Sequence, residues 1–260
     1  MKSRLSVTVI THNEEANIVD CLESASWADE IVVLDSDSTD RTVLWAKQFT
    51  DRVYSVPWHG FGKNKNQAID EARMEWIFVL DADERITPAL RREIQEVLKG
   101  DGPADGYRVP RRNHFCGRFI RHLGWYPDYS IRLFRKANGR FIEREVHESV
   151  EINGSVGTLR EPMLHYTYRT ISDFVLRMDR YSTLAAQELL KQDKKPHFGE
   201  LVWRPFFTFL SLYAFKKGFL EGRAGYTLAF LYSTYNFLKY YKFRELHEQR
   251  AKDGGQPLED

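Results

Sequence analysis

The sequence contains little cysteine, no long apolar run and no excess of charge of one sign. Its two cysteines, Cys21 and Cys116, are too few for a disulfide framework and are typical of reduced thiols in a cytoplasmic protein. The 38 basic side chains nearly balance the 37 acidic ones, which argues against a nucleic-acid-binding protein. No stretch reaches the ~20 apolar residues of a membrane-spanning helix, and the apolar run at residues 7–10 is too short for a signal peptide. We therefore expect a cytoplasmic protein.

Apolar runs and helical patterns alternate over the first hundred residues. The patterns predict strands at residues 5–10, 30–35, 52–56 and 75–80, and helices at 17–25, 41–49, 63–72 and 88–98. Apolar strands separated by helices are typical of a mostly parallel sheet covered on both faces. The predicted fold class is therefore α/β.

The pattern changes after about residue 105. Strand-like segments at 106–110, 130–134 and 150–152, with turn signals at Asn138-Gly139 and Asn153-Gly154, predict a mixed antiparallel extension. Residues 172–191 and 201–250 are expected to be helical.

Polar clusters follow three of the predicted strands. They are Thr11-His12-Asn13-Glu14, the segment 35–40 with its three aspartates, and Asp81-Ala82-Asp83-Glu84. Ligands of such sheets bind beyond the carboxyl ends of the strands. The convergence of three polar clusters at these ends predicts a ligand site there.

Asp81 and Asp83 form the most informative of these clusters. Two carboxylates at i and i+2 after a buried strand can reach one cation if the chain bends there, and Mg²⁺ and Mn²⁺ prefer oxygen ligands with phosphate. Taken alone, Asp-x-Asp is more often a solvated acidic loop. Its place after a strand, beside two other polar strand ends, favours a metal and diphosphate site.

The other clusters are open to two interpretations. Acids in the segment 35–40 can accept hydrogen bonds from ribose or base, while Asp40 can cap the following helix. The segment 11–14 is either a helix cap or part of a binding site. The segment 60–66, with two glycines and two lysines, can approach phosphate at a helix start, but it lacks the Gly-Lys-Ser/Thr ending of an ATPase P-loop.

The order of these motifs resembles that of family-2 glycosyltransferases, which have the GT-A fold. Over residues 5–100 the matching segments are Thr11-x-Asn13-Glu14, Asp35-Ser36-x-Ser38-Thr39-Asp40, Lys65-Asn66-x-Ala68 and Leu80-Asp81-Ala82-Asp83-Glu84. Later segments resemble a bacterial subgroup that includes glucosyltransferases of lipopolysaccharide inner-core assembly: Gly124-Trp125-Tyr126-Pro127-Asp128, Arg132-Leu133-Phe134-Arg135 and Val146-His147-Glu148. The resemblance implies an inverting enzyme that uses nucleotide-diphosphate sugars with Mg²⁺ or Mn²⁺.

The resemblance also implies a role for each matching position. The nucleotide pocket would be lined by Thr11, Asn13, Glu14, Asp35 and Asp37. The family's basic nucleotide-binding segment falls on Lys63, Lys65 and Asn66. The metal motif falls on Asp81 and Asp83, and we prefer Asp83 of the two as the direct ligand; Asp81 also borders the nucleotide sugar.

An inverting transfer needs a general base that deprotonates the acceptor hydroxyl. Many family members use the aspartate of a Glu-Asp pair beyond the metal motif, and this chain has no such pair there. Glu148 follows Gly139-Arg140-Phe141 much as the family's pair follows its own Gly-x-Phe, so we predict Glu148 as the base and Asp128 as the alternative. A purely structural interpretation of Glu148 is a salt bridge at a strand end. For His147, a packed or hydrogen-bonded side chain is as consistent with the pattern as a contact with phosphate or metal.

The predicted domain organisation follows from these assignments. A GT-A catalytic domain spans residues 1–195, with a nucleotide-sugar-binding half at 1–105 and an acceptor-side half at 106–195. Aromatic amphipathic helices follow at 196–250, and a disordered tail at 251–260. Residues 201–243 interleave aromatics with Lys and Arg, which suits either docking on the inner face of the cytoplasmic membrane or packing against the catalytic domain or a second subunit.

The leading hypothesis is sugar transfer to a lipid-linked or lipopolysaccharide-core acceptor, with a UDP-sugar as donor. A nucleotidyltransferase or sugar-phosphate pyrophosphorylase also uses paired acids on an α/β sheet, but a Gly-rich phosphate loop would follow its first strand. A non-catalytic nucleotide-sugar-binding protein is the third interpretation. The intact Asp81, Asp83 and a candidate base argue against it.

Overall fold

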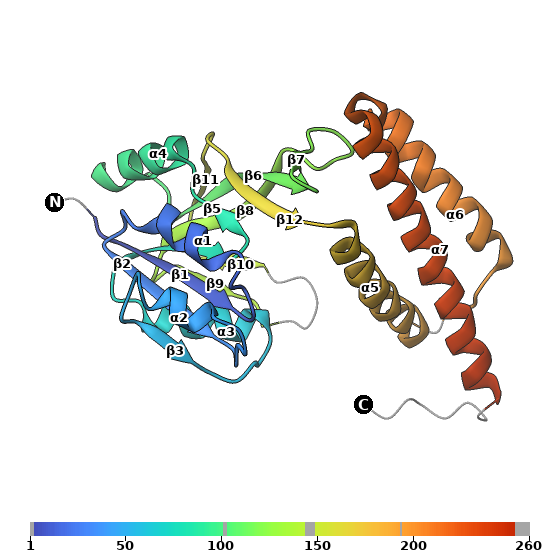
Figure 1. The fold of residues 1–260 in the computed structure, drawn as a ribbon, viewed down its shortest axis with the longest axis horizontal. Helices are drawn as coiled ribbons and strands as arrows, with labels where there is room; N and C mark the ends of the chain where they lie inside the picture. Colours follow the sequence, from blue (N-terminus) through green and yellow to red (C-terminus); the bar gives the residue numbers. More distant parts are fainter. Residues whose placement is uncertain (1–2, 101–102, 144–148, 193, 253–260) are drawn as a thin grey trace. The chain divides into compact units, whose positions relative to one another are not determined.

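The computed structural model describes residues 3–100, 103–143, 149–192 and 194–252 (Figure 1). The chain forms two compact units. The first contains Met1–Asn113 and Pro127–Thr167, and the second contains His114–Tyr126 and Tyr168–Asp260. Each unit has its own apolar cluster.

The first unit is built on a mixed sheet whose first four strands are parallel, in the order β3-β2-β1-β4. These strands are β1 (Leu5–Thr11), β2 (Glu30–Asp35), β3 (Val53–Ser55) and β4 (Trp76–Asp81). The sheet continues through β8 (Asp128–Arg135), β6 (Gly106–Phe115), β12 (Met163–Tyr168) and β5 (Glu84–Arg85). Because β8 is antiparallel to both β4 and β6, the predicted mixed extension is confirmed.

Smaller strands complete the first unit. β11 (Val156–Thr158) pairs with β6 in parallel. β9 (Gly139–Phe141) and β10 (Val150–Ile152) form an antiparallel pair next to the predicted turn signals.

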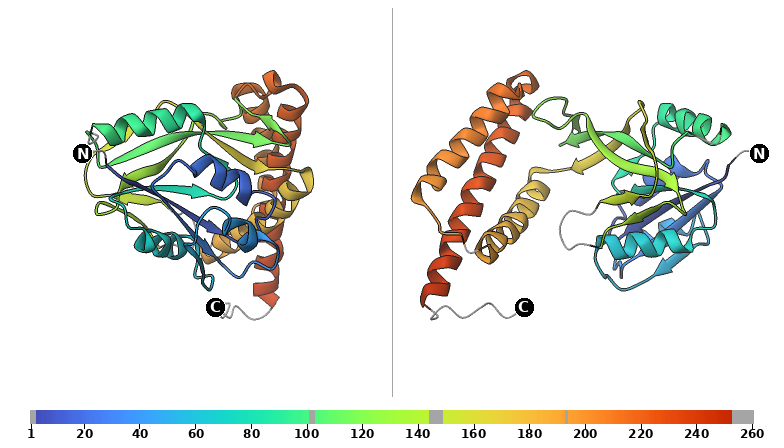
Figure 2. Two further views of the ribbon diagram at one scale, coloured as in Figure 1. Left: turned by 60° about the vertical axis from the view of Figure 1, so that its left-hand side comes forward. Right: turned by 180° about the vertical axis from the view of Figure 1, so that it is seen from behind.

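Helices cover both faces of the parallel part of the sheet (Figure 2). They are α1 (Ile18–Ala25), α2 (Thr42–Ala46), α3 (Phe61–Glu71) and α4 (Pro88–Lys99). Along β4, Trp76, Phe78 and Leu80 belong to one buried cluster, which also contains residues of α1 and α4. Ile77 and Val79 belong to the opposite cluster, with α3. This two-residue alternation explains why the strand is apolar throughout, and it confirms the predicted α/β class.

The carboxyl ends of the central strands meet at one edge of the sheet. In the strand register Thr11 lies opposite Asp35, and Ile10 lies opposite Asp81. The three polar clusters that follow these strands therefore lie side by side, as the sequence predicts.

The second unit is a helical assembly. Its helices are α5 (Ile171–Lys191), α6 (Phe198–Leu210) and α7 (Gly222–Lys252), with a π-helical turn at Ser211–Phe215 and a 3₁₀ turn at Gly218–Glu221. The unit also includes β7 (Arg118–Phe119), which pairs with the end of β6. Among the described residues, no helix is both long and apolar enough to cross a membrane.

Helix α5 belongs to the same compact unit as the C-terminal helices, whereas the predicted catalytic domain extends through it to residue 195. Two contacts explain this difference. Phe174 and Met178 of α5 pack in one apolar cluster with Leu228 of α7. The ammonium of Lys242 in α7 donates to Asp179 Oδ1 at 2.7 Å and to nearby hydroxyls of α5. The predicted tail at 251–260 lies outside the described residues from 253 onward.

Gly225 provides a test of the packing in the second unit. A Cβ at this position of α7 would lie against the carbonyl oxygen of Gly218, well inside van der Waals contact. We expect Gly225→Ala to lower the free energy of unfolding by about 2 kcal/mol, measured by urea denaturation. Gly199→Ala in α6 is the matched control, because the added Cβ would have Trp203 at 3.7 Å as its nearest neighbour. The control should be neutral or up to ~1 kcal/mol stabilising, and equal effects of the two changes would contradict this packing.

Candidate active site

Asp81 is the last residue of β4, and both of its carboxylate oxygens contact cations of the protein. The ammonium of Lys65, from α3, lies 2.8 Å from Asp81 Oδ1. The guanidinium of Arg132, from β8, donates to Asp81 Oδ2 at 2.6 Å. Lys65 and Arg132 are almost fully buried. Asp81 is therefore held by two short ion pairs from separate elements.

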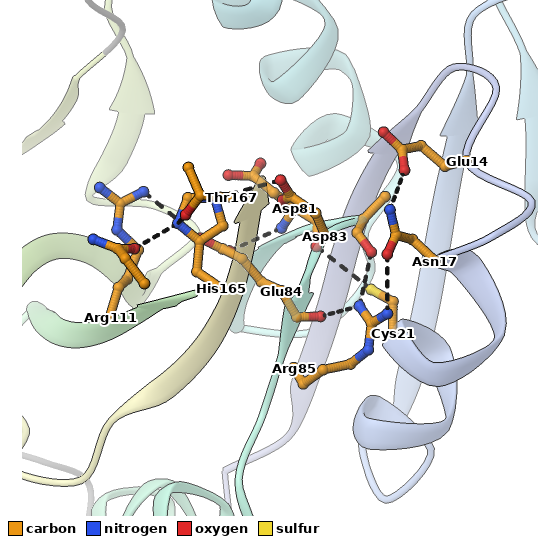
Figure 3. Close-up of polar contacts among 12 residues, drawn as sticks. Glu14, Asn17, Cys21, Asp81, Asp83, Glu84, Arg85, Arg111, His165 and Thr167 are labelled. Carbon is orange, nitrogen blue, oxygen red and sulfur yellow. Dashed lines mark hydrogen bonds and ion pairs between the residues drawn. The ribbon is translucent and has the colours of Figure 1, made fainter. Parts of the chain in front are cut away.

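Glu84 extends this cluster from the start of β5. Its side chain is fully buried, and its Oε1 accepts from the same Arg132 guanidinium at 2.6 Å. Arg111 of β6 lies 3.7 Å from this oxygen. The other oxygen, Oε2, accepts from the backbone N–H of Asp81 at 3.1 Å. Glu84 thus closes the turn between β4 and β5 and joins Arg132 to Arg111. Figure 3 shows Glu84 with Asp81, Asp83 and His165 near it.

The two acids respond differently to this environment. Burial acts to raise the pKa of Asp81, but the charges of Arg132 and Lys65 outweigh it and hold that pKa well below the usual range. Burial raises the pKa of Glu84, and the neighbouring charge of Asp81 raises it further despite Arg132. Asp81 is therefore the strongly ionised member of the pair.

Asp83 lies in the turn between β4 and β5 and contacts a histidine rather than the ion-pair cluster. Its Oδ2 is 3.4 Å from Nε2 of His165 in β12. Nδ1 of the same ring lies 2.7 Å from Asn113 Oδ1. Because an amide oxygen only accepts, Nδ1 carries a proton, and the other nitrogen, Nε2, is directed toward Asp83. Burial lowers the pKa of His165, but the hydrogen bond and charge of Asp83 and the charge of Glu84 raise it overall.

Asp128, the alternative base, belongs to the same cluster. Its Oδ2 is 2.6 Å from the guanidinium of Arg111 and accepts from Asn113 Nδ2 at 3.1 Å. The contacts run without a break from Lys65 through Asp81, Arg132, Glu84, Arg111, Asp128, Asn113 and His165 to Asp83. Acids that lie far apart in the sequence are therefore assembled in one site.

The segments after β1 and β2 are joined to each other by side-chain hydrogen bonds. Asp35 is buried and accepts from the Ser38 hydroxyl at 2.5 Å and from the Ser38 N–H at 3.0 Å. Asn13 Oδ1 accepts from the Thr39 N–H at 2.8 Å. Asp40 Oδ1 accepts from the Thr42 N–H at 2.9 Å, at the start of α2. The Asn13–Thr39 bond joins the two segments, and the other bonds order the segment after β2; we call these two segments the rim.

The remaining predicted residues of this rim differ in exposure. Thr11 is buried, Glu14 is half-buried and accepts from Asn17 at 2.6 Å, and Asp37 is exposed with a left-handed φ of 57°. Left-handed backbone is uncommon outside glycine and is a mark of constrained turns.

The three predicted residues of α3 point in different directions. Lys63 is exposed. Lys65 is buried and contacts Asp81. Asn66 is buried and pairs with the backbone of Phe141 in β9, donating to its oxygen at 3.0 Å and accepting from its N–H at 2.9 Å. Only Lys65 of the three has a contact with the acidic cluster among those found in the described part of the chain.

Sequence reasoning did not assign roles to Arg132, Glu84, Arg111, Asn113 or His165, although Glu84 and Arg132 lie within segments that carry the resemblance. For Arg132 the signal is a charged side chain inside an otherwise apolar stretch, Ser130-Ile131-Arg132-Leu133-Phe134. Glu148, the predicted base, and His147 lie outside the described residues.

The side chains available as metal ligands fit a divalent cation only in part. Within the described residues there is no group of three or more His, Cys, Asp or Glu side chains placed to hold a metal ion. Asp83 provides a carboxylate, which together with phosphate oxygens suits Mg²⁺ or Mn²⁺, and the imidazole of His165 lies beside it as a softer ligand.

Comparison with known proteins defines the class of this site. The sequence profile described as "Glycosyl transferase family 2" matches residues 6–159. The chain is 33% identical over 264 residues to the lipopolysaccharide core biosynthesis glycosyltransferase LpsC of Rhizobium meliloti (strain 1021), with 96% of each chain covered. It is 29% identical over 266 residues to an uncharacterized glycosyltransferase of Rickettsia bellii (strain RML369-C), covering 96% of this chain and 89% of the relative.

Among solved structures, residues 1–349 of S. aureus TarS in complex with UDP-GlcNAc are similar with a TM-score of 0.48 and 17% identity, covering 98% and 93% of the two chains. Glucosyl-3-phosphoglycerate synthase from Mycobacterium tuberculosis, in complex with Mg²⁺ and UDP, has 26% identity, a TM-score of 0.37 and coverage of 42% and 44%.

The site at the acidic carboxyl edge of the parallel sheet is therefore that of a glycosyltransferase. The chain belongs to glycosyltransferase family 2. Family membership confirms sugar transfer and decides against nucleotidyl transfer.

Arg132 gives a test of the buried cluster. We expect Arg132→Met to lower the free energy of unfolding by about 3 kcal/mol, because it leaves Glu84 buried without its closest cation. Adding Glu84→Gln should recover part of this loss, because the unpaired charge is removed. Urea denaturation of the wild type, both single variants and the double variant measures the coupling. Strictly additive losses would show that Arg132 and Glu84 do not depend on each other.

Proposed function

We propose that this enzyme is an inverting glycosyltransferase that moves a sugar from a nucleotide-diphosphate donor, a UDP-sugar, to a lipid-linked or lipopolysaccharide-core acceptor. The observation that carries the proposal is the Asp83–His165 pair at the edge of the sheet, next to a neutralised Asp81. The role of the relative LpsC in lipopolysaccharide core biosynthesis supports the class of acceptor.

Asp83 and His165 hold the divalent cation, Mg²⁺ or Mn²⁺, in this proposal. When bound, the cation neutralises the charge that develops on the diphosphate leaving group. Asp81 is less suited to be a direct ligand, because Lys65 and Arg132 already contact both of its carboxylate oxygens. Asp81 instead keeps these two cations in place beside the nucleotide sugar. His165 is kept in one tautomer by Asn113, which leaves Nε2 facing the cation site.

The nucleotide is assigned to the rim formed by the segments after β1 and β2. Thr11, Asn13, Glu14, Asp35 and Asp37 remain the proposed lining of the pocket. On α3, Lys63 offers an exposed ammonium and Lys65 reaches the acidic edge, while Asn66 positions the segment through the backbone of Phe141. Hydrogen bonds from Asn13 to Ser38 and from Thr39 to Asn13 join the rim segments and preorganise this pocket.

The chemical step needs a carboxylate that takes the proton of the acceptor hydroxyl as that oxygen attacks the anomeric carbon. The bond from this carbon to the diphosphate oxygen breaks on the opposite side, so the configuration is inverted. Glu148 is the proposed base. Asp128 is the alternative, and its contacts with Arg111 and Asn113 through one oxygen also suit a carboxylate that positions its neighbours.

An acceptor of this class is anchored in a bilayer by its lipid part. The proposal therefore includes a peripheral position of the enzyme on the inner face of the cytoplasmic membrane.

A thermal-shift panel of nucleotide-diphosphate sugars, each with and without Mn²⁺, tests the donor and the metal site. We expect the correct donor to stabilise the protein only with Mn²⁺, by about 2.7 kcal/mol at a concentration of 100 times Kd. Asp83→Asn and His165→Gln should each lose this metal-dependent shift, because each removes a ligand. Asp51→Asn, at an exposed acid away from the cluster, is the matched control. A full metal-dependent shift and normal turnover in Asp83→Asn would refute the metal assignment.

The base is tested by two isosteric substitutions. Glu148→Gln should lower kcat by about 10²-fold or more, because the acceptor hydroxyl loses its proton acceptor, while the donor-induced thermal shift stays normal. Glu151→Gln, at an exposed acid in β10, is the control for a local charge change. If Glu148→Gln retains normal turnover and Asp128→Asn abolishes it, Asp128 is the base.

A further inference from the structure

Helix α6 has two sides that differ in what they contact. On the inner side, Ser233 of α7 donates to the Pro205 oxygen at 2.8 Å, and Asn236 donates to the Thr208 hydroxyl at 2.9 Å. The outer side carries a stripe of large apolar residues that are exposed by 50 to 70%: Phe198, Val202, Trp203, Phe206 and Phe207. The spacing of these residues places them on one face of the helix. The exposed stripe is therefore a separate surface and not an unfilled part of the core.

The turn after α6 continues this surface with apolar and basic residues. Phe215 is 78% exposed, and Phe219 and Leu220 are each more than half exposed. Lys216 and Lys217 lie between them and are also exposed. We call residues 198–220, with their exposed aromatic and basic side chains, the α6 surface.

Basic residues outnumber acidic residues in this region. Residues 196–243 contain six Lys and Arg but only two Glu, Glu200 and Glu221. Glu221 is buried and accepts from the N–H groups of Arg121 and His122, and Glu200 lies 3.6 Å from Arg204. The acids are therefore compensated within the unit, and the basic excess remains.

A groove of about 770 Å³ lies along the same helix. Its apolar lining includes Trp203, Phe207 and Leu212, and Arg204 and Lys216 border it. The rings of Trp203, Phe206 and Phe207 are mutually in contact, with centroids 5.6 to 6.3 Å apart. Aromatic rings beside cationic side chains are the combination that prefers the boundary between lipid headgroups and acyl chains.

We infer that the α6 surface docks onto an anionic lipid bilayer, with its aromatic stripe at the level of the headgroups and its basic side chains near the lipid phosphates. Charge complementarity favours an anionic bilayer as the partner of this surface. A second copy of the chain would present the same basic excess and repel it, whereas an anionic bilayer attracts each Lys and Arg. The inference rests on the proposed function for its purpose, which is access to a lipid-linked acceptor.

Flotation of the full-length protein with vesicles tests this inference. We expect binding to vesicles with about 30% phosphatidylglycerol in phosphatidylcholine, little binding to phosphatidylcholine alone, and weaker binding at high salt. Trp203→Ser/Phe206→Ser and Lys216→Gln/Lys217→Gln should each weaken binding roughly tenfold or more. Leu44→Ser/Leu176→Ser removes two apolar residues elsewhere that are also more than half exposed, and this variant should bind as the wild type. Circular dichroism and the Tm of each variant verify folding.

The inference is overturned if the wild type does not float with anionic vesicles, or if the two α6-surface variants float as well as the control. It is also overturned if the wild type dimerises in sedimentation and Trp203→Ser/Phe206→Ser is a monomer, because the surface then belongs to a second copy. The metal-dependent thermal shift caused by the sugar donor is measured on the same variants. Loss of vesicle binding with a normal donor shift supports the docking role, and an absent donor shift in the wild type contradicts the proposed function alone.

Discussion

The ion pairs of Arg132 are the contacts on which the rest of the site depends. Its almost fully buried guanidinium joins Asp81 and Glu84, two acids of one short turn. Two carboxylates so close together in a buried place would repel each other strongly without a cation between them. Lys65 adds a second cation beside Asp81, and Arg111 adds one near Glu84. Side chains from α3, β4, β5, β6 and β8 therefore depend on one another for their charge balance.

This balance separates the roles of the two aspartates in the metal motif. Asp81 pairs through one carboxylate oxygen with Lys65 and through the other with Arg132, so both of its oxygens already have partners. Asp83 contacts His165, whose imidazole can lose its proton and offer a lone pair to a metal. The difference in partners, and not in the aspartates themselves, makes Asp83 the better candidate ligand.

The α6 surface follows from a different constraint. The inner side of α6 is used by contacts with α7, and the core of this unit is built from Phe115, Phe174 and Leu228 with their neighbours. The outer aromatics are exposed even though the helices are packed, so a partner outside the chain gives the simplest account of them. Exposed apolar residues with basic neighbours distinguish an anionic bilayer from a neutral protein partner.

The sequence by itself determined the α/β order, the strand ends and the acidic edge, because strand periodicity and the residues that follow each strand are local properties. It also indicated the family through motifs in residues 5–100. Only the tertiary structure decided that Arg132, Arg111, Asn113 and His165 meet Asp81 and Asp83. These residues come from β6, β8 and β12, and the register of distant strands depends on packing between them rather than on any local pattern. The sequence also could not show that the aromatic stripe of α6 is exposed. An aromatic face at helical spacing has the same pattern whether it packs against the core or faces outward.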